Sequence, residues 1–335
     1  MLDREFRVMD LGWTLRRGRG LAHQVLGLNR RARARLDGTR ACILNYHRVI
    51  PESWAERDSV EAGMYVTPAS FRLQLEILRE LFHVMPLGEL AERVRDGRSL
   101  PHGACAITFD DGWRDNLEHG LPELRRADLP ATIFVVTERV GSDGAFWPDE
   151  VCRRLRPLAS DEVADVARAM KLPAGVSDVD DVLDRLKALP ESERDEPLAR
   201  LREATPSPGA ARRELLTWEE LGALRDAGIA IESHGATHAI LTGLGSDEVE
   251  TELRASRETL LDRGFGGDAL FAYPSGCHDE RIHGLVERAG YRAAFVLDER
   301  LVEFGSEPMT MSRMGMHEGI GRTRVEFLCK VPGWL

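Results

Sequence analysis

From residue 41 onward, short apolar runs alternate with amphipathic stretches of helical period, and this alternation limits the fold more than any other feature of the sequence. The runs at 104–109 and 131–136 have the length of strands, and the second is rich in β-branched residues. The segment 71–82 carries its apolar residues on one helical stripe. Further strands are expected at 42–46, near Val84, and at 229–232, 270–273, 293–297 and 309–314, with helices at 121–127, 247–263 and 279–289. Strands in alternation with helices predict an α/β fold built on a parallel sheet or a barrel.

One stretch, from about 149 to 214, interrupts the alternation because it offers no strand candidate. It has a charged helical pattern with breaks expected at Pro173, Pro190, Pro197, Pro206 and Pro208. We therefore expect a helical insertion within a domain that spans 41–335. The insertion either walls one side of a functional cleft or is a solvated excursion, and the sequence leaves both readings open.

Residues 1–40 differ from the rest because arginines are interleaved there with leucine, valine and tryptophan. We expect a helical extension that packs its apolar side on the main domain. The alternative is a basic amphipathic segment in peripheral contact with an anionic membrane. The segment lacks the apolar core of an export signal, so a cytoplasmic protein is expected, in the alternative case at the inner membrane face.

Charge and cysteine content exclude some classes of protein. The formal net charge of -11 argues against a nucleic-acid-binding surface. The five cysteines are odd in number and form no CxxC pair, which fits a reducing compartment better than a disulfide framework or a thiolate zinc site. Nothing in the sequence indicates the oligomeric state.

Two adjacent acidic residues, Asp110 and Asp111, end the strand expected at 104–109, and Gly112 follows them. Adjacent carboxylates repel each other. A divalent cation resolves this when it takes one carboxylate as a ligand and leaves the other as a base. Alone, such a motif is more often a turn or a helix N-cap.

Two histidines four residues apart, His234 and His238, follow the strand expected at 229–232. On a helical turn both imidazoles would lie on one face and could share an ion, although as an isolated pair they would be surface residues just as often. One Asp and two His make an open three-ligand metal site. The position of both motifs after strands favours a barrel whose C-terminal face holds the site.

Taken in order, these motifs resemble the polysaccharide deacetylase family, the NodB-like group also called carbohydrate esterase family 4, over about residues 41–317. The matching segments are Asn45-Tyr46-His47-Arg48-Val49, Tyr65-Val66-Thr67-Pro68, Thr108-Phe109-Asp110-Asp111-Gly112, Ser233-His234 with His238, Phe271-Ala272-Tyr273-Pro274-Ser275-Gly276 and Ser312-Arg313-Met314. The resemblance implies a distorted (β/α)7-type barrel. It also implies metal-dependent hydrolysis of an N-acetyl group on a sugar, with release of acetate.

The resemblance also implies roles for individual residues. Asp111, His234 and His238 would bind the metal, most often zinc in this family, with cobalt, nickel, iron or manganese as alternatives. Asp110 would be the general base. A backbone N–H near Tyr273, in the loop that includes Pro274, would help to hold the oxyanion.

Two positions depart from the family pattern. The family's third motif commonly begins with an arginine that orients the base, and Ala272 stands there. We expect Arg313 to reach the same place from the opposite side of the barrel. The family's general acid has no clean match. We prefer His317 for it, with His47 as a pocket residue.

The substrate is the least determined feature of the chain. We expect an N-acetylated sugar or glycan precursor, such as a nucleotide-linked or lipid-linked sugar. Trp147 either stacks on a sugar ring or packs in the core. The alternatives are hydrolysis of a formyl or cyclic imide amide, and a non-catalytic carbohydrate-binding relative. The presence of Asp110 argues against the last, because binding needs no base.

Overall fold

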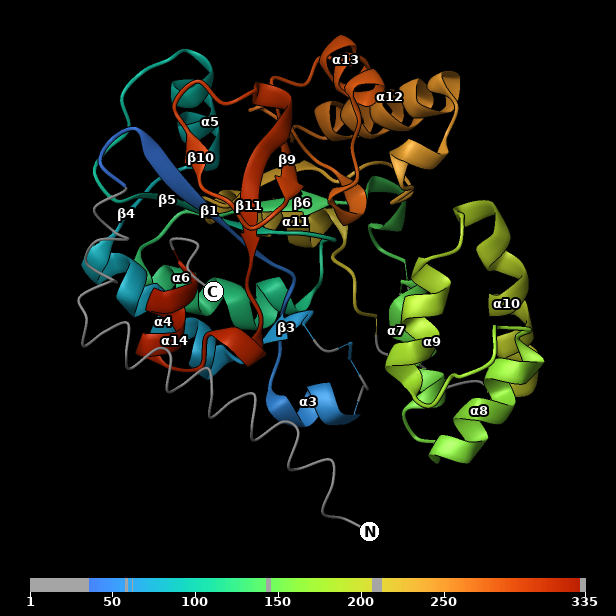
Figure 1. Cartoon of the computed structure of the whole chain (residues 1–335). Coiled ribbons are helices and arrows are strands. Elements are labelled where there is room, and N and C mark those ends of the chain that lie inside the picture. Colours follow the sequence, from blue (N-terminus) through green and yellow to red (C-terminus); the bar gives the residue numbers. More distant parts are fainter. Residues whose placement is uncertain (1–35, 58–59, 62, 143–145, 207–212, 332–335) are drawn as a thin grey trace.

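The computed structural model describes residues 36–57, 60–61, 63–142, 146–206 and 213–331, and within them seven parallel strands close into a barrel (Figure 1). Around the barrel these are β1 (Arg40–Tyr46), β5 (Ala104–Phe109), β6 (Thr132–Val135), β7 (Ala230–Ser233), β8 (Leu270–Ala272), β9 (Ala293–Leu297) and β11 (Met311–Gly315). The barrel closes at β1, which pairs in parallel with β5 on one side and β11 on the other. The expected α/β fold is confirmed, and its parallel strands form a closed barrel and not an open sheet.

Successive side chains of each strand point to opposite faces, so each strand serves two layers. On β8, Leu270 and Ala272 join an apolar cluster with Phe134 of β6 and Phe295 of β9. Phe271 instead belongs to a cluster shared with the surrounding helices. The first cluster fills the barrel interior. The polar site described below lies beyond it, toward the carboxyl ends of the strands.

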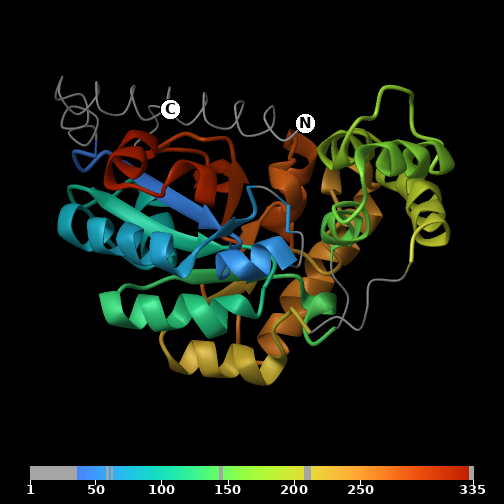
Figure 2. The same cartoon turned by 90° about the horizontal axis from the view of Figure 1, so that it is seen from below.

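Helices surround the barrel and bury its outer face (Figures 1 and 2). They are α4 (Pro68–Leu81), α5 (Leu87–Arg95), α6 (Leu121–Ala127), α11 (Trp218–Asp226), α12 (Ser246–Asp262), α13 (Glu280–Arg288) and α14 (Arg324–Lys330). Shorter elements are β2 (Arg48–Val49), α3 (Glu52–Arg57), β3 (Tyr65–Val66), β4 (His83–Val84) and β10 (Val302–Glu303). The start of α4 is encoded locally, because the Thr67 side chain accepts a hydrogen bond from the Ser70 N–H and Pro68 occupies the first turn.

In the stretch expected as an insertion, the described residues form four helices, which make a lobe beside the barrel (Figures 1 and 2). They are α7 (Trp147–Leu155), α8 (Ser160–Ala169), α9 (Val179–Lys187) and α10 (Glu191–Ala204). Their apolar faces pack into a cluster of their own that includes Leu155, Leu183 and Leu201. The break expected at Pro197 is wrong, because α10 continues through this residue.

Most of the expected strands and helices lie within a few residues of their observed bounds. The sequence reading missed α5, α11 and α14, which are short helices. The arginine-rich extension expected at 1–40 falls almost entirely outside the described residues, so both readings of it stay predictions. Among the described residues, no helix is long and apolar enough to cross a bilayer.

Candidate active site

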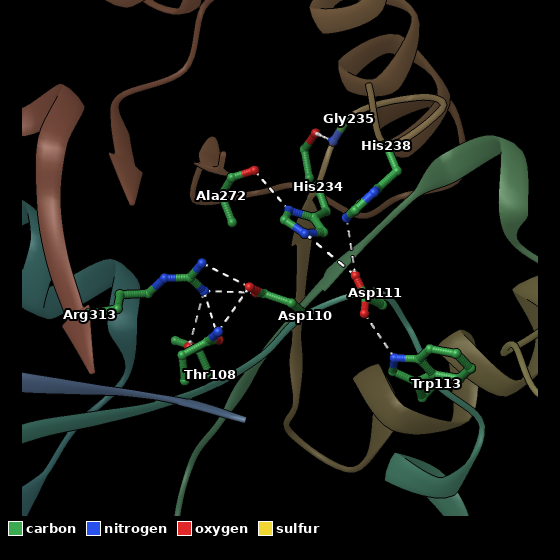
Figure 3. Close-up of polar contacts among 11 residues, drawn as sticks. Thr108, Asp110, Asp111, Trp113, His234, Gly235, His238, Ala272 and Arg313 are labelled. Carbon is green, nitrogen blue, oxygen red and sulfur yellow. Dashed lines mark hydrogen bonds and ion pairs between the residues drawn. The ribbon is translucent and has the colours of Figure 1, made fainter. Parts of the chain in front are cut away.

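The two adjacent carboxylates leave the end of β5 in different directions (Figure 3). Asp111 has a φ of 76° and Gly112 a φ of 78°, so the chain turns sharply through the left-handed region. This conformation is costly for a residue with a side chain and is often found at functional sites. A Cβ at Gly112 would also lie 3.1 Å from Cγ1 of Val135. The turn therefore needs glycine after Asp111.

Asp110 is held in a buried network by Arg313 and Asn45. Nη1 of Arg313 donates to Oδ1 of Asp110 at 2.7 Å and Nη2 donates to Oδ2 at 2.8 Å (Figure 3). The side-chain Nδ2 of Asn45 donates to Oδ2 of Asp110 at 3.0 Å, and Nη1 of Arg313 also donates to the side-chain Oδ1 of Asn45 at 2.9 Å. Burial acts to raise the pKa of Asp110, but the fields of Arg313 and His234 outweigh it and hold the pKa well below its usual range. Asp110 is therefore a carboxylate at neutral pH.

Asp111, His234 and His238 converge on one point. Oδ1 of Asp111 lies 3.5 Å from Nε2 of His234 and 3.5 Å from Nε2 of His238. Oδ2 of Asp111 accepts a hydrogen bond from Nε1 of Trp113 at 2.9 Å, which leaves Oδ1 facing the histidines (Figure 3). Nδ1 of His234 lies 2.8 Å from the carbonyl oxygen of Ala272, which can only accept, so this nitrogen carries the proton. The Nε2 lone pair then points toward Asp111.

The histidine pair does not lie on a helical turn, and that expectation is wrong. His234 directly follows β7, and the loop to His238 is irregular because Gly235 has a φ of 86° and His238 a φ of 75°. The loop brings the two imidazole rings within 4.9 Å of each other, at 70° between their planes. The pair shares one site through this backbone shape and not through helical spacing.

The residues present fit a divalent cation. One ligand atom from each of Asp111, His234 and His238 lies within 4.8 Å of the others. Burial lowers the pKa of His234 to about 4 and that of His238 to about 4, so both rings are neutral at pH 7 and can donate a lone pair. Carboxylate and neutral imidazole donors with a position left open are typical of catalytic zinc sites.

A family model described as polysaccharide deacetylase matches residues 97–294, more than half of the chain. The chain belongs to this family. A curated relative is the putative polysaccharide deacetylase YxkH of Bacillus subtilis (strain 168), 20% identical over 193 residues. That match covers 57% of this chain but spans only 44% of the relative.

Solved structures of other deacetylases share the fold. The Streptococcus pyogenes deacetylase PplD, solved with acetate, superposes with a TM-score of 0.57 at 16% identity, over 85% of this chain and 96% of the other. IcaB from Ammonifex degensii superposes with a TM-score of 0.56 at 16% identity, over 89% of this chain and 97% of the other. At this level of identity the likeness extends to the fold alone.

The two histidines considered for the general acid lie differently relative to the candidate site. His47 directly follows β1 and stands two residues after Asn45, whose side chain bonds Asp110, so the alternation of side chains along a strand places both residues on the same face. His317 follows β11 and caps a short 3-10 helix, where its Nδ1 accepts the Gly319 N–H at 3.2 Å. The geometry therefore favours His47 more than the sequence did.

The other residues expected to bind substrate, Tyr273, Pro274 and Trp147, are buried or packed against apolar side chains. Tyr273 is fully buried against the helices outside β8, and its amide donates to the carbonyl of Phe295 at 3.1 Å. Its side chain offers no surface to a substrate. Pro274 is buried at the start of the following loop. Trp147 packs against the apolar cluster of the insertion, with the Arg194 guanidinium 4.8 Å from its ring centre, which agrees better with packing than with sugar stacking.

Three residues of the site were not singled out from the sequence. Asn45 bonds to Asp110, Trp113 bonds to Asp111, and the Phe146 ring lies 5.0 Å from the His238 ring. Asn45 belongs to the Asn45–Val49 segment that resembles the family, so its position at the end of β1 could have indicated a site residue. Trp113 and Phe146 read as ordinary core aromatics, and nothing in their spacing indicates a site.

Proposed function

We propose that this protein is a metal-dependent hydrolase that removes the N-acetyl group from an amino sugar in a glycan or glycoside precursor and releases acetate. The observation that carries the proposal is the position of Asp111 Oδ1, 3.5 Å from both imidazole Nε2 atoms, beside a second carboxylate fixed by Arg313. Membership in the polysaccharide deacetylase family supports the reaction type.

Asp111, His234 and His238 would hold the cation, with zinc expected before cobalt, nickel, iron or manganese. Such an ion acts as a Lewis acid and makes water a nucleophile near neutral pH. Asp110 takes the proton from the attacking water. Its ion pair with Arg313 and its bond from Asn45 keep it ionised and aimed, so that no rotation is needed when the substrate arrives.

A backbone amide in the loop after β8 is proposed to donate to the oxyanion. The amide of Tyr273 is already used by Phe295, and Pro274 has no N–H. The next amide along the chain belongs to Ser275, and it is the N–H that we propose for this role. The departing amine needs a proton, and we propose His47 or His317 as its source.

The substrate class rests on the family and on composition. We propose an N-acetylhexosamine in a glycan, a nucleotide-linked sugar or a lipid-linked sugar, handled in the cytoplasm. Residues 1–40 would provide peripheral contact with the inner membrane face if the substrate is lipid-linked. No nucleic-acid partner is proposed, given the net charge of -11.

A product assay tests the reaction type. Metal-loaded wild type and Asp110→Asn would be incubated with matched N-acetyl and N-formyl hexosamine compounds, and acetate and formate measured separately. The proposal expects acetate from wild type and a loss of about 10²-fold or more in the variant. Formate without acetate would point to another amide. No product from any compound would favour a binding protein.

A further inference from the structure

A buried ionic cluster lies against the indole ring of Trp113, whose N–H bonds Asp111. Its centre is Arg48 on β2, which is 4% exposed. Nε of Arg48 donates to Oδ2 of Asp115 at 2.9 Å, and Oδ1 of Asp115 accepts the Val49 N–H at 2.8 Å. The Asp115 carboxylate therefore bonds both the Arg48 side chain and the next backbone amide, which fixes the direction of the guanidinium.

Both ends of the helical insertion meet at Arg48. Asp149 lies in the first turn of α7, where the insertion leaves the barrel, and Glu214 lies where the chain returns. Nη1 of Arg48 is 3.7 Å from Oδ1 of Asp149 and 3.7 Å from Oε2 of Glu214. It has no closer hydrogen-bond partner among the described residues, so Arg48 faces both carboxylates and is bonded to neither.

The returning end of the insertion is also bonded to the loop that carries the metal ligand. Trp113 and Leu215 form an antiparallel bridge. The amide of Arg114 donates to the carbonyl of Glu214 at 2.6 Å, and that of Leu216 donates to the carbonyl of Gly112 at 2.9 Å. A displacement of this end would therefore move the backbone next to Asp111.

Arg48 also contacts this loop by lying over the indole ring of Trp113. Its guanidinium carbon lies 4.2 Å from the centre of the Trp113 indole, a close cation–π distance. The Trp113 ring is 1% exposed, and its N–H is the donor to Oδ2 of Asp111. Hydrogen bonds to the ligand atoms of a metal site set ligand orientation, and their loss typically lowers metal affinity 10- to 100-fold.

We infer that Arg48 is a positioning residue for the metal ligand Asp111. It holds the two ends of the insertion against the indole whose N–H fixes that carboxylate. The inference rests on the proposed function, because it takes Asp111 to be a ligand. By this inference, the two ends of the insertion help to position Asp111, and its helices need not contact the substrate.

Metal affinity of the full-length apo-protein tests this inference without turnover. Zinc and cobalt dissociation constants would be measured by competition with a chromogenic chelator, together with the melting temperature of each apo-variant. Trp113→Phe keeps an aromatic ring, smaller than the indole, and removes the N–H, and should weaken binding about 10- to 100-fold. Arg48→Met should weaken it in the same direction. The double variant should be little weaker than Trp113→Phe alone, because both changes act through one hydrogen bond.

Two further variants keep the test decisive. Arg114→Met removes the neighbouring arginine, whose ion pairs are with Glu118 and Glu220, and should leave metal affinity within about twofold of wild type. If Arg48→Met does not fold, Arg48→Lys takes its place. Lysine keeps the charge toward the carboxylates but cannot stack flat on the indole, so it should still weaken binding several-fold.

The outcomes separate this inference from the proposed function. Wild-type affinity in Trp113→Phe and in the Arg48 variant would overturn the inference while leaving the deacetylase proposal intact. Equal losses in Arg48→Met and Arg114→Met would also overturn it, since the effect would then be general destabilisation. A wild type that binds neither metal would remove the proposed function itself.

Discussion

Arg313 and Asp110 are 203 residues apart in the sequence and form a two-pronged ion pair in the barrel interior, with N–O distances of 2.7 and 2.8 Å. Arg313 comes from β11 and Asp110 from the end of β5, and β1 lies between these strands. The backbone of Ala272, on the other side of the barrel, instead bonds the His234 ring. The guanidinium thus reaches the proposed base from the side of the barrel opposite to Ala272.

Replacement of Arg313 by methionine should lower kcat about 10²-fold, because Asp110 loses its orientation. It should also shift the acidic limb of the pH–rate profile to higher pH. Arg313 lowers the pKa of Asp110, so without it the carboxylate is protonated at a higher pH. Arg313→Lys should recover part of the activity but not the bidentate geometry. Unchanged turnover and an unchanged acidic limb in Arg313→Met would contradict the role of this residue.

The general acid can be assigned from the alkaline limb of the same profile. Loss of a proton donor removes the decline in rate that its deprotonation causes at high pH. We expect His47→Asn to abolish that limb and lower kcat about 10²-fold, because His47 follows β1 on the same face as Asn45, which bonds Asp110. His317→Asn serves as the matched variant and should retain the limb. The reverse result would restore His317 as the acid.

Because the carboxyl group of Asp149 is buried, we expect the stability of the fold to depend on pH. Burial raises the pKa of Asp149 to about 7, against the fields of Arg48 and Arg153 and with those of Glu214 and Asp111. A carboxyl whose pKa is raised by folding destabilises the folded state as it ionises, so the penalty grows from about pH 4 and is complete above pH 7. Asp149→Asn should therefore raise the melting temperature by about 2–6 °C at pH 8.5, with a smaller gain near pH 5. A gain that is the same at both pH values would be inconsistent with this pKa.

Alanine substitution at two glycines distinguishes the cost of a positive φ from the cost of a steric contact. Gly112 and Gly141 have similar positive φ values of 78° and 80°. A Cβ at Gly141 would meet nothing within 4 Å, whereas one at Gly112 would press on Val135. Gly141→Ala should cost about 1 kcal/mol of unfolding free energy. Gly112→Ala should cost about 2–4 kcal/mol and reduce metal affinity as well. Equal denaturant midpoints for the two variants would refute the steric account.

Much of the barrel could be predicted from the sequence because its strands are short, apolar and bounded by polar residues. Ala104–Phe109 and Ala293–Leu297 were predicted at their observed bounds. Closure of the barrel depends on pairing of β1 with β11, between residues such as Leu44 and Met314, and local periodicity carries no information about such a pairing. The resemblance to a known family supplied that part of the prediction.

The site was harder to predict where geometry depends on backbone shape. The spacing of His234 and His238 suggested a helix, but two left-handed residues bend that loop. Trp113 follows a glycine and reads as a core residue, since hydrogen bonding by an indole N–H leaves no mark in the sequence. The same holds for Arg48, whose position between the two ends of the insertion follows from the fold alone.

The most direct test of the central claim is the metal content of purified protein, measured by mass spectrometry together with acetate release. Wild type would be compared with His234→Ala/His238→Ala and with the matched His278→Ala/His283→Ala variant, whose histidine pair lies outside the site. The account predicts about one divalent ion per chain in wild type and in the matched variant, and loss of both metal and acetate release in the site variant. Full metal content in His234→Ala/His238→Ala, or acetate release that persists without metal, would contradict it.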